Sequence, residues 1–267
     1  MAYRLLPCFV CRSTSFITAN PSASGSRSYS VNLSDRGVDA AALLALRLHQ
    51  DERMLSPGFP MSAKTVERPP WSPWGREYVN TPGRFIWGTR PSALAREANE
   101  LTADRARVLD LGCGEGRDSV FLAEQGHDVV GVDLSLDGLR KAQRLVKNRG
   151  VRVAWVCAAL PDLPVRGPFD LVYSCGAIHY VARGERGALF ARLRCLTRRG
   201  GHHAHVVFTG RRIYREKSEV VHYFAPDELR RAYRGWIIVR HDAGWIPCAQ
   251  DGVHHVHSVE TILARRP

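Results

Sequence analysis

The residues of this sequence that are best suited to chemistry form a glycine-rich loop between two carboxylates. Gly112, Gly114 and Gly116 fall within five residues after an apolar segment, and glycine lets a ligand lie against bare backbone. Asp110 precedes the loop. Asp133 ends the next apolar segment, where nucleotide-binding β-α-β units place the acid that binds ribose hydroxyls. The pattern predicts a binding site for a small molecule that contains a nucleoside.

The spacing of the glycines distinguishes between ligands of this kind. Dinucleotide-binding loops follow G-x-G-x-x-G, whereas this chain has G-x-G-x-G with an acid, Asp110, two residues ahead of the first glycine. A carboxylate there would repel a pyrophosphate, but it suits the positive sulfonium and ammonium groups of S-adenosylmethionine. The spacing therefore favours S-adenosylmethionine over NAD as the cofactor.

Apolar segments alternate with helical segments around the loop. Strands are predicted near residues 107–111, 128–133, 151–157, 169–174 and 202–209, and helices near 91–101, 117–126, 136–148, 184–197 and 226–233. Such alternation is typical of β-α-β units and of a parallel sheet covered on both faces. Two last strands, near 236–242 and 257–266, have no helix between them, which predicts an antiparallel hairpin at the sheet edge. We expect an α/β fold with a doubly wound, mostly parallel, seven-stranded sheet.

Three parts of the chain differ in composition. Residues 1–60 begin with a stretch, 1–34, that has Arg and Ser but no acid, as in a mitochondrial transit peptide; a disordered or spurious upstream extension is the alternative that we favour. Residues 61–102 combine five aromatic residues with Pro and Gly, which predicts a loop-rich lid or, equally, ordinary packing on the core. Residues 103–267 contain the glycine loop and the predicted sheet.

Three segments of the chain resemble the class I S-adenosylmethionine-dependent methyltransferases. They are VLDLGCGEGRDS at 108–119, VVGVDLS at 129–135 and PFDLVYSCGAIHYV at 168–181. The resemblance covers about residues 71–266. It implies a Rossmann-like fold, methyl transfer from S-adenosylmethionine, and S-adenosylhomocysteine as a product.

The resemblance also implies which residues bind the cofactor. Asp110 and the three glycines would hold the methionine end, Asp133 the ribose hydroxyls, and Leu134 would pack on the adenine. Such enzymes often place an Asp near the adenine amine, but this chain has Ala159, so that contact would fall to the backbone of Leu160 or to Asp162. The expected cofactor-binding residues are Asp110, Gly112, Cys113, Gly114, Gly116, Arg117, Asp133, Leu134, Ala159, Leu160 and Ser174.

Two stretches are most similar to the tellurite-resistance methyltransferases: GCGEGRDSVFLAEQGHDVVGVD, and FAPDELRRAYRGWIIVRHD followed by TILARR. This similarity implies a small, soft acceptor such as a thiol or a reduced chalcogen. A soft anionic acceptor needs no general base, whereas an alcohol, a phenol or a protonated amine needs one. Residues 174–181 follow the fourth strand and should line the acceptor side. His179 and Tyr180 are the candidate catalytic residues there; a hydrogen-bonded wall histidine and a packing tyrosine are the alternatives. Arg211 and Arg212 could attract an anionic acceptor.

The distribution of charge argues against a nucleic-acid partner. The formal net charge is +12, but 34 of the 38 basic residues are Arg, and they are interleaved with acids rather than clustered. The fourth strand also ends in YSCGA rather than in the N/D-P-P-Y/F loop of amino-methylating nucleic-acid enzymes. We therefore expect a small-molecule methyl acceptor; a nucleic-acid methyltransferase and a non-catalytic cofactor-binding protein are the alternatives. The sequence has no run of eighteen apolar residues, so we predict no membrane span. Nothing in the sequence indicates the oligomeric state.

The cysteines and histidines are candidates for disulfides and for metal ligands. Seven cysteines, an odd number without disulfide-framework spacing, predict free thiols in a reducing compartment, hence a cytoplasmic protein, or a mitochondrial one if residues 1–34 are a transit peptide. Half-sites for a metal are the pairs Cys8 and Cys11, His203 and His205, and His255 and His257. No further ligand completes a pair at fixed spacing, so we expect no metal.

Overall fold

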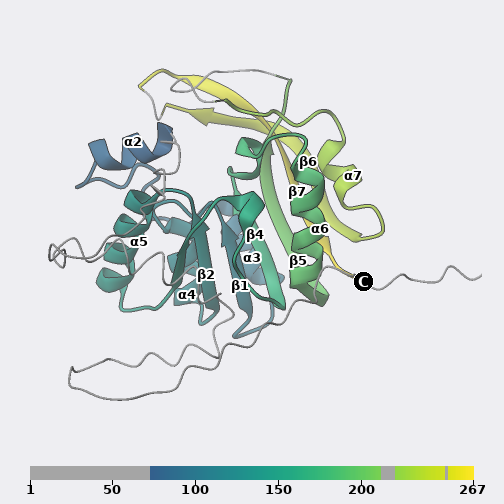
Figure 1. Cartoon of the computed structure of the whole chain (residues 1–267), viewed down its shortest axis with the longest axis horizontal. Helices are drawn as coiled ribbons and strands as arrows, with labels where there is room; N and C mark the ends of the chain where they lie inside the picture. The colour runs from purple at the N-terminus through teal and green to yellow at the C-terminus, as the bar shows by residue number, and fades with distance from the viewer. Residues whose placement is uncertain (1–72, 212–219, 250–251) are drawn as a thin grey trace, which may run out of the picture. The chain divides into compact units, whose positions relative to one another are not determined.

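Seven strands form one sheet in the computed structural model, which describes residues 73–211, 220–249 and 252–267 (Figure 1). The strands are β1 (Arg107–Leu111), β2 (Asp128–Asp133), β3 (Ala154–Cys157), β4 (Phe169–Cys175), β5 (Thr197–Phe208), β6 (Ile237–Cys248) and β7 (His255–Arg265). Their order in the sheet is β3-β2-β1-β4-β5-β7-β6. The first five pair in parallel, and β7 pairs antiparallel with both β5 and β6.

Helices cover both faces of this sheet. They are α2 (Pro73–Asn80), α3 (Ala93–Glu100), α4 (Arg117–Glu124), α5 (Leu136–Arg149), α6 (Arg186–Leu196) and α7 (Glu228–Ala232), with 3-10 turns η3 (Leu160–Asp162) and η4 (Ile178–Tyr180). Val108 of β1 packs in one apolar cluster with α3 and α4, whereas Leu109 packs in another with α6 and α7. Successive residues of a strand point to opposite faces, so the apolar runs of the central strands fill both cores.

Local sequence explains where the helices beside the glycine loop begin and end. The hydroxyl of Ser135 accepts a hydrogen bond from the backbone N–H of Gly138 at 3.1 Å and caps the start of α5. Gly150 ends α5 in the left-handed conformation, at φ 69°. Gly116, at φ 81°, begins α4 directly after the loop. The loop is therefore held between two well-defined elements, β1 and α4.

The predicted α/β fold, with its mostly parallel sheet and antiparallel terminal hairpin, is confirmed. The bounds predicted for β1 and β2 are those observed, because buried apolar residues make up these strands. The prediction for β6 was wrong in length: the strand runs to Cys248 rather than to 242. β6 lies at the sheet edge and is mostly exposed, so it lacks an apolar alternation, and an edge strand tolerates Pro247.

Some predictions concern residues that the structure does not describe. Those made for residues 1–60, and for Arg212, lie outside the described residues. Within the described residues, none of the helices combines the length and the apolar character needed to cross a membrane.

Candidate cofactor site

The glycine loop lies where β1 and β2 end side by side. Gly112, Gly114 and Gly116 have φ values of 71°, 52° and 81°, a backbone conformation that favours glycine. The N–H of Gly112 donates to the carbonyl of Val132 at 2.7 Å, which ties the loop to the end of β2. A Cβ added to Gly112 would lie 2.1 Å from the Cβ of Ala177, so no side chain fits between the loop and the segment after β4.

Asp133 is held by the backbone on both sides of its carboxylate. One oxygen accepts the N–H of Gly114 at 2.7 Å, and the other accepts the N–H of Ser135 at 2.7 Å. Burial raises the pKa of Asp133, although both hydrogen bonds oppose this shift. A carboxylate has about four lone-pair sites, so each oxygen keeps one for a further donor.

Asp110 has a different environment from Asp133. It is 2% exposed, and the hydroxyl of Ser119 donates to it at 2.5 Å. Burial, with a smaller contribution from the nearby charge of Asp118, raises the pKa of Asp110 to about 7. This carboxyl group therefore titrates near neutral pH.

Arg117, which is half-buried, and the buried Asp118 form an ion pair at the first turn of α4. Two guanidinium nitrogens of Arg117 donate to the two carboxylate oxygens of Asp118 at 2.9 and 2.8 Å. Asp118 also accepts the hydroxyl of Tyr173 and the N–H of Ser92, each at 2.8 Å. Burial acts to raise the pKa of Asp118, but Arg117 and the other donors outweigh it and hold the pKa below its usual value. Arg117 also donates to the sulfur of Cys175 at 3.8 Å, which places its charge at the end of β4.

The residues predicted to contact the adenine lie near the ends of β2 and β3, and the thiol of Cys113 lies in the glycine loop. Leu134 and Ala159 are half-buried at the ends of β2 and β3, where the N–H of Ala158 donates to the carbonyl of Asp133 at 3.0 Å. Leu160 begins η3 and is half-buried, whereas Asp162 is exposed. Burial raises the pKa of the Cys113 thiol well above its usual value, so this thiol stays protonated.

Three predicted residues, one at the end of β4 and two after it, make contacts within the protein. Ser174 is fully buried and donates to the carbonyl of Leu111 at 3.0 Å. His179 is also fully buried; its Nδ1 accepts the N–H of Phe208 at 3.1 Å, and its ring stacks on Phe208 with centroids 3.9 Å apart. The Tyr180 hydroxyl accepts the indole N–H of Trp74 at 2.8 Å.

The tautomer of His179 follows from these contacts. An Nδ1 that accepts a backbone N–H carries no proton, so the neutral ring holds its proton on Nε2. Burial, followed by the charges of His257 and Arg186, lowers the pKa of His179 well below its usual value. The nitrogen able to accept a proton is therefore already used by Phe208, and the base role of His179 stays a prediction.

A second buried ion pair, which the sequence did not suggest, joins the loop to the aromatic segment before it. Lys141 of α5 pairs with Glu115 of the loop, and both are no more than 2% exposed. Lys141 also donates to the carbonyls of Thr81 at 2.8 Å and Arg84 at 2.6 Å. Lysine is rare in this chain, with four residues in 267, and this rarity was the available signal for Lys141.

The aromatic segment contacts the loop as well. A Cβ on Gly114 would lie 2.7 Å from the hydroxyl oxygen of Tyr78, so Tyr78 packs directly against the loop. The N–H of Trp87 donates to Glu115 at 3.3 Å. With the bond from Trp74 to Tyr180, residues 74–87 contact both the loop and the segment after β4.

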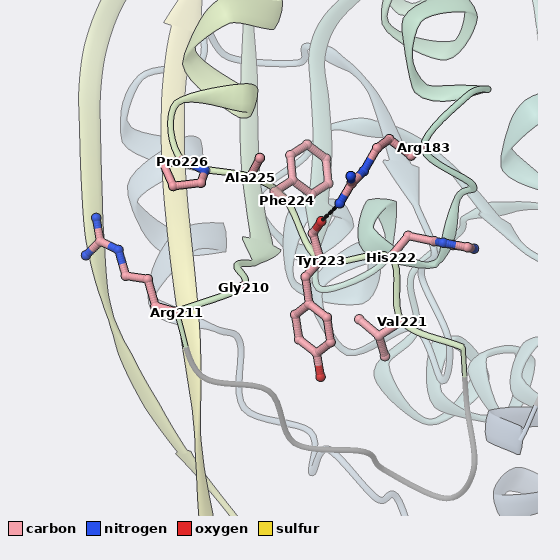
Figure 2. A pocket seen from close by; sticks show the side chains of 9 residues that line it. All are labelled: Arg183, Gly210, Arg211, Val221, His222, Tyr223, Phe224, Ala225 and Pro226. Carbon is pink, nitrogen blue, oxygen red and sulfur yellow. Dashed lines mark hydrogen bonds between the residues drawn. The ribbon is translucent and has the colours of Figure 1, made fainter.

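A pocket of about 480 Å³ lies beyond the end of β5 (Figure 2). Its lining includes Arg183, Arg211, His222 and Tyr223. In Figure 2 the guanidinium of Arg183 points to the carbonyl of Tyr223, to which it donates at 3.3 Å. The side chain of Arg211 extends away from Arg183 and Tyr223. The N–H of His222 donates to the carbonyl of His179 at 2.9 Å, so the pocket adjoins the segment after β4.

Comparison with known proteins gives the family that part of this chain resembles. Residues 108–201 match a family described as a methyltransferase domain. Over these residues the chain is similar to a methyltransferase domain. It is 34% identical to the magnesium-protoporphyrin O-methyltransferase of Rhodobacter capsulatus over 122 residues, 45% of this chain and 50% of that protein. It is 29% identical to the tRNA 5-carboxymethoxyuridine methyltransferase of Escherichia coli K12 over 109 residues, 39% of this chain and 42% of that protein.

Solved structures share the fold of this methyltransferase domain. A 1,6-didemethyltoxoflavin-N1-methyltransferase from Burkholderia thailandensis, solved with S-adenosylhomocysteine, is 26% identical, with a TM-score of 0.52 over 73% of this chain and 87% of that one. TehB from Haemophilus influenzae is 19% identical, with a TM-score of 0.59 over 65% of this chain and 61% of that one, which shows the fold alone. The chain spans about half, or less, of the length of the curated relatives named above.

Proposed function

We propose that this protein transfers the methyl group of S-adenosylmethionine to a small-molecule acceptor that binds beside residues 174–181. The observation that carries the proposal is the fixed carboxylate of Asp133, which lies next to three glycines with positive φ. A cofactor ribose can donate two hydroxyls to the lone pairs that the backbone leaves available. Because the three glycines have no Cβ, the part of the cofactor between its ribose and its methionine end can lie directly against the loop backbone.

The other cofactor contacts follow from position in the site. We assign the methionine end to Asp110, whose carboxylate would offset the positive ammonium and sulfonium groups, and to the backbone of residues 112–116. We assign the adenine to the apolar surface of Leu134 and to the backbone at Ala159 and Leu160. Ser174 and Arg117 then act through the protein, because Ser174 bonds to Leu111 and Arg117 to Asp118.

The chemistry asked of the protein is mainly alignment. Bound S-adenosylmethionine supplies a methyl group that its sulfonium already activates. The protein has to hold the acceptor atom about 3–3.5 Å from that carbon and in line with the bond that breaks, an effect on the order of 7–11 kcal/mol at best. Residues 74–87, which touch both the loop and the segment after β4, are suited to close over the reacting groups and exclude water.

The arrangement after β4 favours an acceptor that needs no general base. The proton acceptor of His179 is occupied by Phe208, and the hydroxyl of Tyr180 is bonded to Trp74. A thiolate or a reduced chalcogen attacks without losing a proton to the enzyme. The charges of Arg183 and Arg211, which line the pocket beyond β5, would favour such an anion.

A second candidate is methylation of RNA. The net charge of +12 and the similarity to a tRNA methyltransferase over 109 residues favour it. The absence of clustering among the basic residues disfavours it. The two candidates predict different acceptors and different responses to salt.

The experiment is a methyl-transfer assay that follows formation of S-adenosylhomocysteine. The acceptor panel contains thiols, chalcogen oxyanions with a reductant, phenols, amines and bulk tRNA. Turnover with a thiol or chalcogen supports the proposal, and turnover only with tRNA replaces it with the second candidate. If the protein binds the cofactor but methylates none of these acceptors, it would instead be a non-catalytic cofactor-binding protein, the remaining alternative from the sequence.

A further inference from the structure

We propose that Cys248, His255 and His257 form a zinc-binding site on the β6–β7 hairpin. Cys248 lies directly opposite His255 in the register of the two strands. His257 lies two residues further along β7 and therefore on the same face. Pairing of the strands thus brings together a thiol and two imidazoles, although they are up to nine residues apart in sequence. This site lies outside the glycine loop and does not depend on the function proposed above.

The side chains approach one another as zinc ligands do. One ligand atom from each residue lies within 4.8 Å of the other two. Bonds of about 2.3 Å to sulfur and 2.0–2.1 Å to nitrogen in a tetrahedron would place these atoms about 3.3–3.7 Å apart. The two Nε2 atoms, which are 2.9 Å apart, would have to separate by about 0.4 Å, and a pair near the 4.8 Å limit would have to close by about 1 Å. Cys248 and His255 are half-buried, and His257 is buried, so the ion would be partly shielded from water.

The hydrogen bonds of the two histidines suit metal binding. His255 Nδ1–H donates to the carbonyl of Val253 at 2.7 Å, so the neutral ring has its lone pair on Nε2. Metal-binding histidines are commonly oriented by such a bond from the other ring nitrogen to a backbone carbonyl. The Nε2 atoms of His255 and His257 are 2.9 Å apart, and His257 supplies the proton between them. Zinc would replace that proton, and His257 would then carry its proton on Nδ1.

The donor set favours zinc over hard cations. Thiolate and imidazole are ligands for zinc and other borderline or soft metals, whereas magnesium and calcium prefer oxygen. Three protein ligands leave one of four zinc positions open for water or a small ligand. A surface pocket of about 470 Å³, lined by residues that include Cys248, His254 and His255, provides access to that position.

The site is connected to the segment after β4 by stacked rings. The ring of His257 stacks on Phe208, with centroids 4.1 Å apart and planes 12° apart, and Phe208 stacks on His179 at 3.9 Å and 11°. An ion that fixes the His257 ring would therefore also limit the movement of the wall to which His179 belongs.

The sequence predicts no metal here because no further ligand completes the pair of His255 and His257 at a fixed spacing. The predicted end of β6 at residue 242 leaves Cys248 outside the hairpin, whereas β6 continues to Cys248. The ligand set became visible only through the register of the hairpin.

Metal titration of the full, untagged chain tests the site, with Cys8 and Cys11 changed to Ser in every protein because they form a separate C-x-x-C. Cobalt serves as a spectroscopic probe of the zinc site. We expect one cobalt per chain, with thiolate-to-cobalt charge-transfer absorption that zinc abolishes by displacement. Cys248→Ser should remove this band, and His255→Gln should weaken zinc binding by at least about tenfold.

A matched control is available on a helix outside the hairpin. Cys195→Ser, which changes an exposed thiol on α6, should leave the spectrum and the affinity unchanged. Circular dichroism of each variant shows that it is folded. A chain that binds no cobalt, or whose charge-transfer band survives Cys248→Ser, would overturn the proposal.

Discussion

At the scale of single residues, three acids near the glycine loop have distinct environments. Asp118 is paired with Arg117 and has a lowered pKa, whereas Asp110 has one hydroxyl partner and a pKa raised to about 7. Asp133 is held by two backbone N–H groups and is half-buried. The same residue type can therefore stabilise a helix end, face a cation or bind hydroxyls, depending on its partners.

The ribose assignment predicts the effect of one substitution. Asp133→Asn should weaken binding of S-adenosylhomocysteine about 10- to 100-fold, because hydrogen bonds to a charged acceptor contribute about 1.5–3 kcal/mol. Isothermal titration calorimetry measures the affinity. The control is Asp128→Asn, at the exposed opposite end of the same strand, and it should have no effect. Equal affinities for the two variants would show that Asp133 does not bind the cofactor.

The raised pKa of Asp110 predicts a dependence on pH. Since the ionised carboxylate favours a cationic ligand, cofactor affinity should rise as pH increases through about 7. Asp110→Asn should remove this rise, and above pH 7 the variant should bind the cofactor more weakly than the unsubstituted protein does. In the protein without ligand the sign is opposite: between about pH 4 and 7 the folded state holds a proton that the unfolded chain has lost, so Asp110 makes the free energy of unfolding fall with pH. A pH profile that is the same in the variant would contradict the assignment.

At the scale of elements, the loop is fixed from both sides. The end of β2 accepts its backbone N–H groups, and Glu115 within it pairs with Lys141 of α5. Lys141 also binds the carbonyls of Thr81 and Arg84. The helix after β2 therefore anchors the segment that contacts the loop, and the buried ion pair connects three parts of the chain.

This anchor predicts a non-additive pair of substitutions. Lys141→Met or Glu115→Gln alone should lower the free energy of unfolding, by about 3–5 kcal/mol for the lysine, because each leaves a buried partner uncompensated. The double variant should recover at least half of that loss, as measured by urea unfolding. Arg144→Met, which removes an exposed bond to the carbonyl of Pro82, should cost less than about 1 kcal/mol. Additive losses in the double variant would mean that the pair is not coupled.

At the scale of the whole molecule, the sequence predicted the parts that burial dictates. Strands such as β1 and β2 are apolar on both faces, so their bounds were visible without a structure. The three glycines and Asp133 were visible because backbone conformation and position restrict the residue types allowed there. Contacts between distant segments were not visible: Lys141 with Glu115, Trp74 with Tyr180, and Cys248 with His255 all depend on how elements pair.

The charge of the molecule makes a prediction about RNA. Because the basic residues are dispersed, binding of bulk tRNA should be weak at physiological salt and should depend little on salt concentration. Filter binding at several salt concentrations measures this. A steep fall of affinity with salt, equivalent to several neutralised phosphates, would instead favour an RNA substrate.

We propose that the loop and Asp133 together form the site for S-adenosylmethionine. Calorimetric titration of the folded full chain with this cofactor tests it most directly. We expect saturable heat with one site per chain, and competition by S-adenosylhomocysteine. Absence of heat at several temperatures from protein shown to be folded, together with no competition, would contradict it.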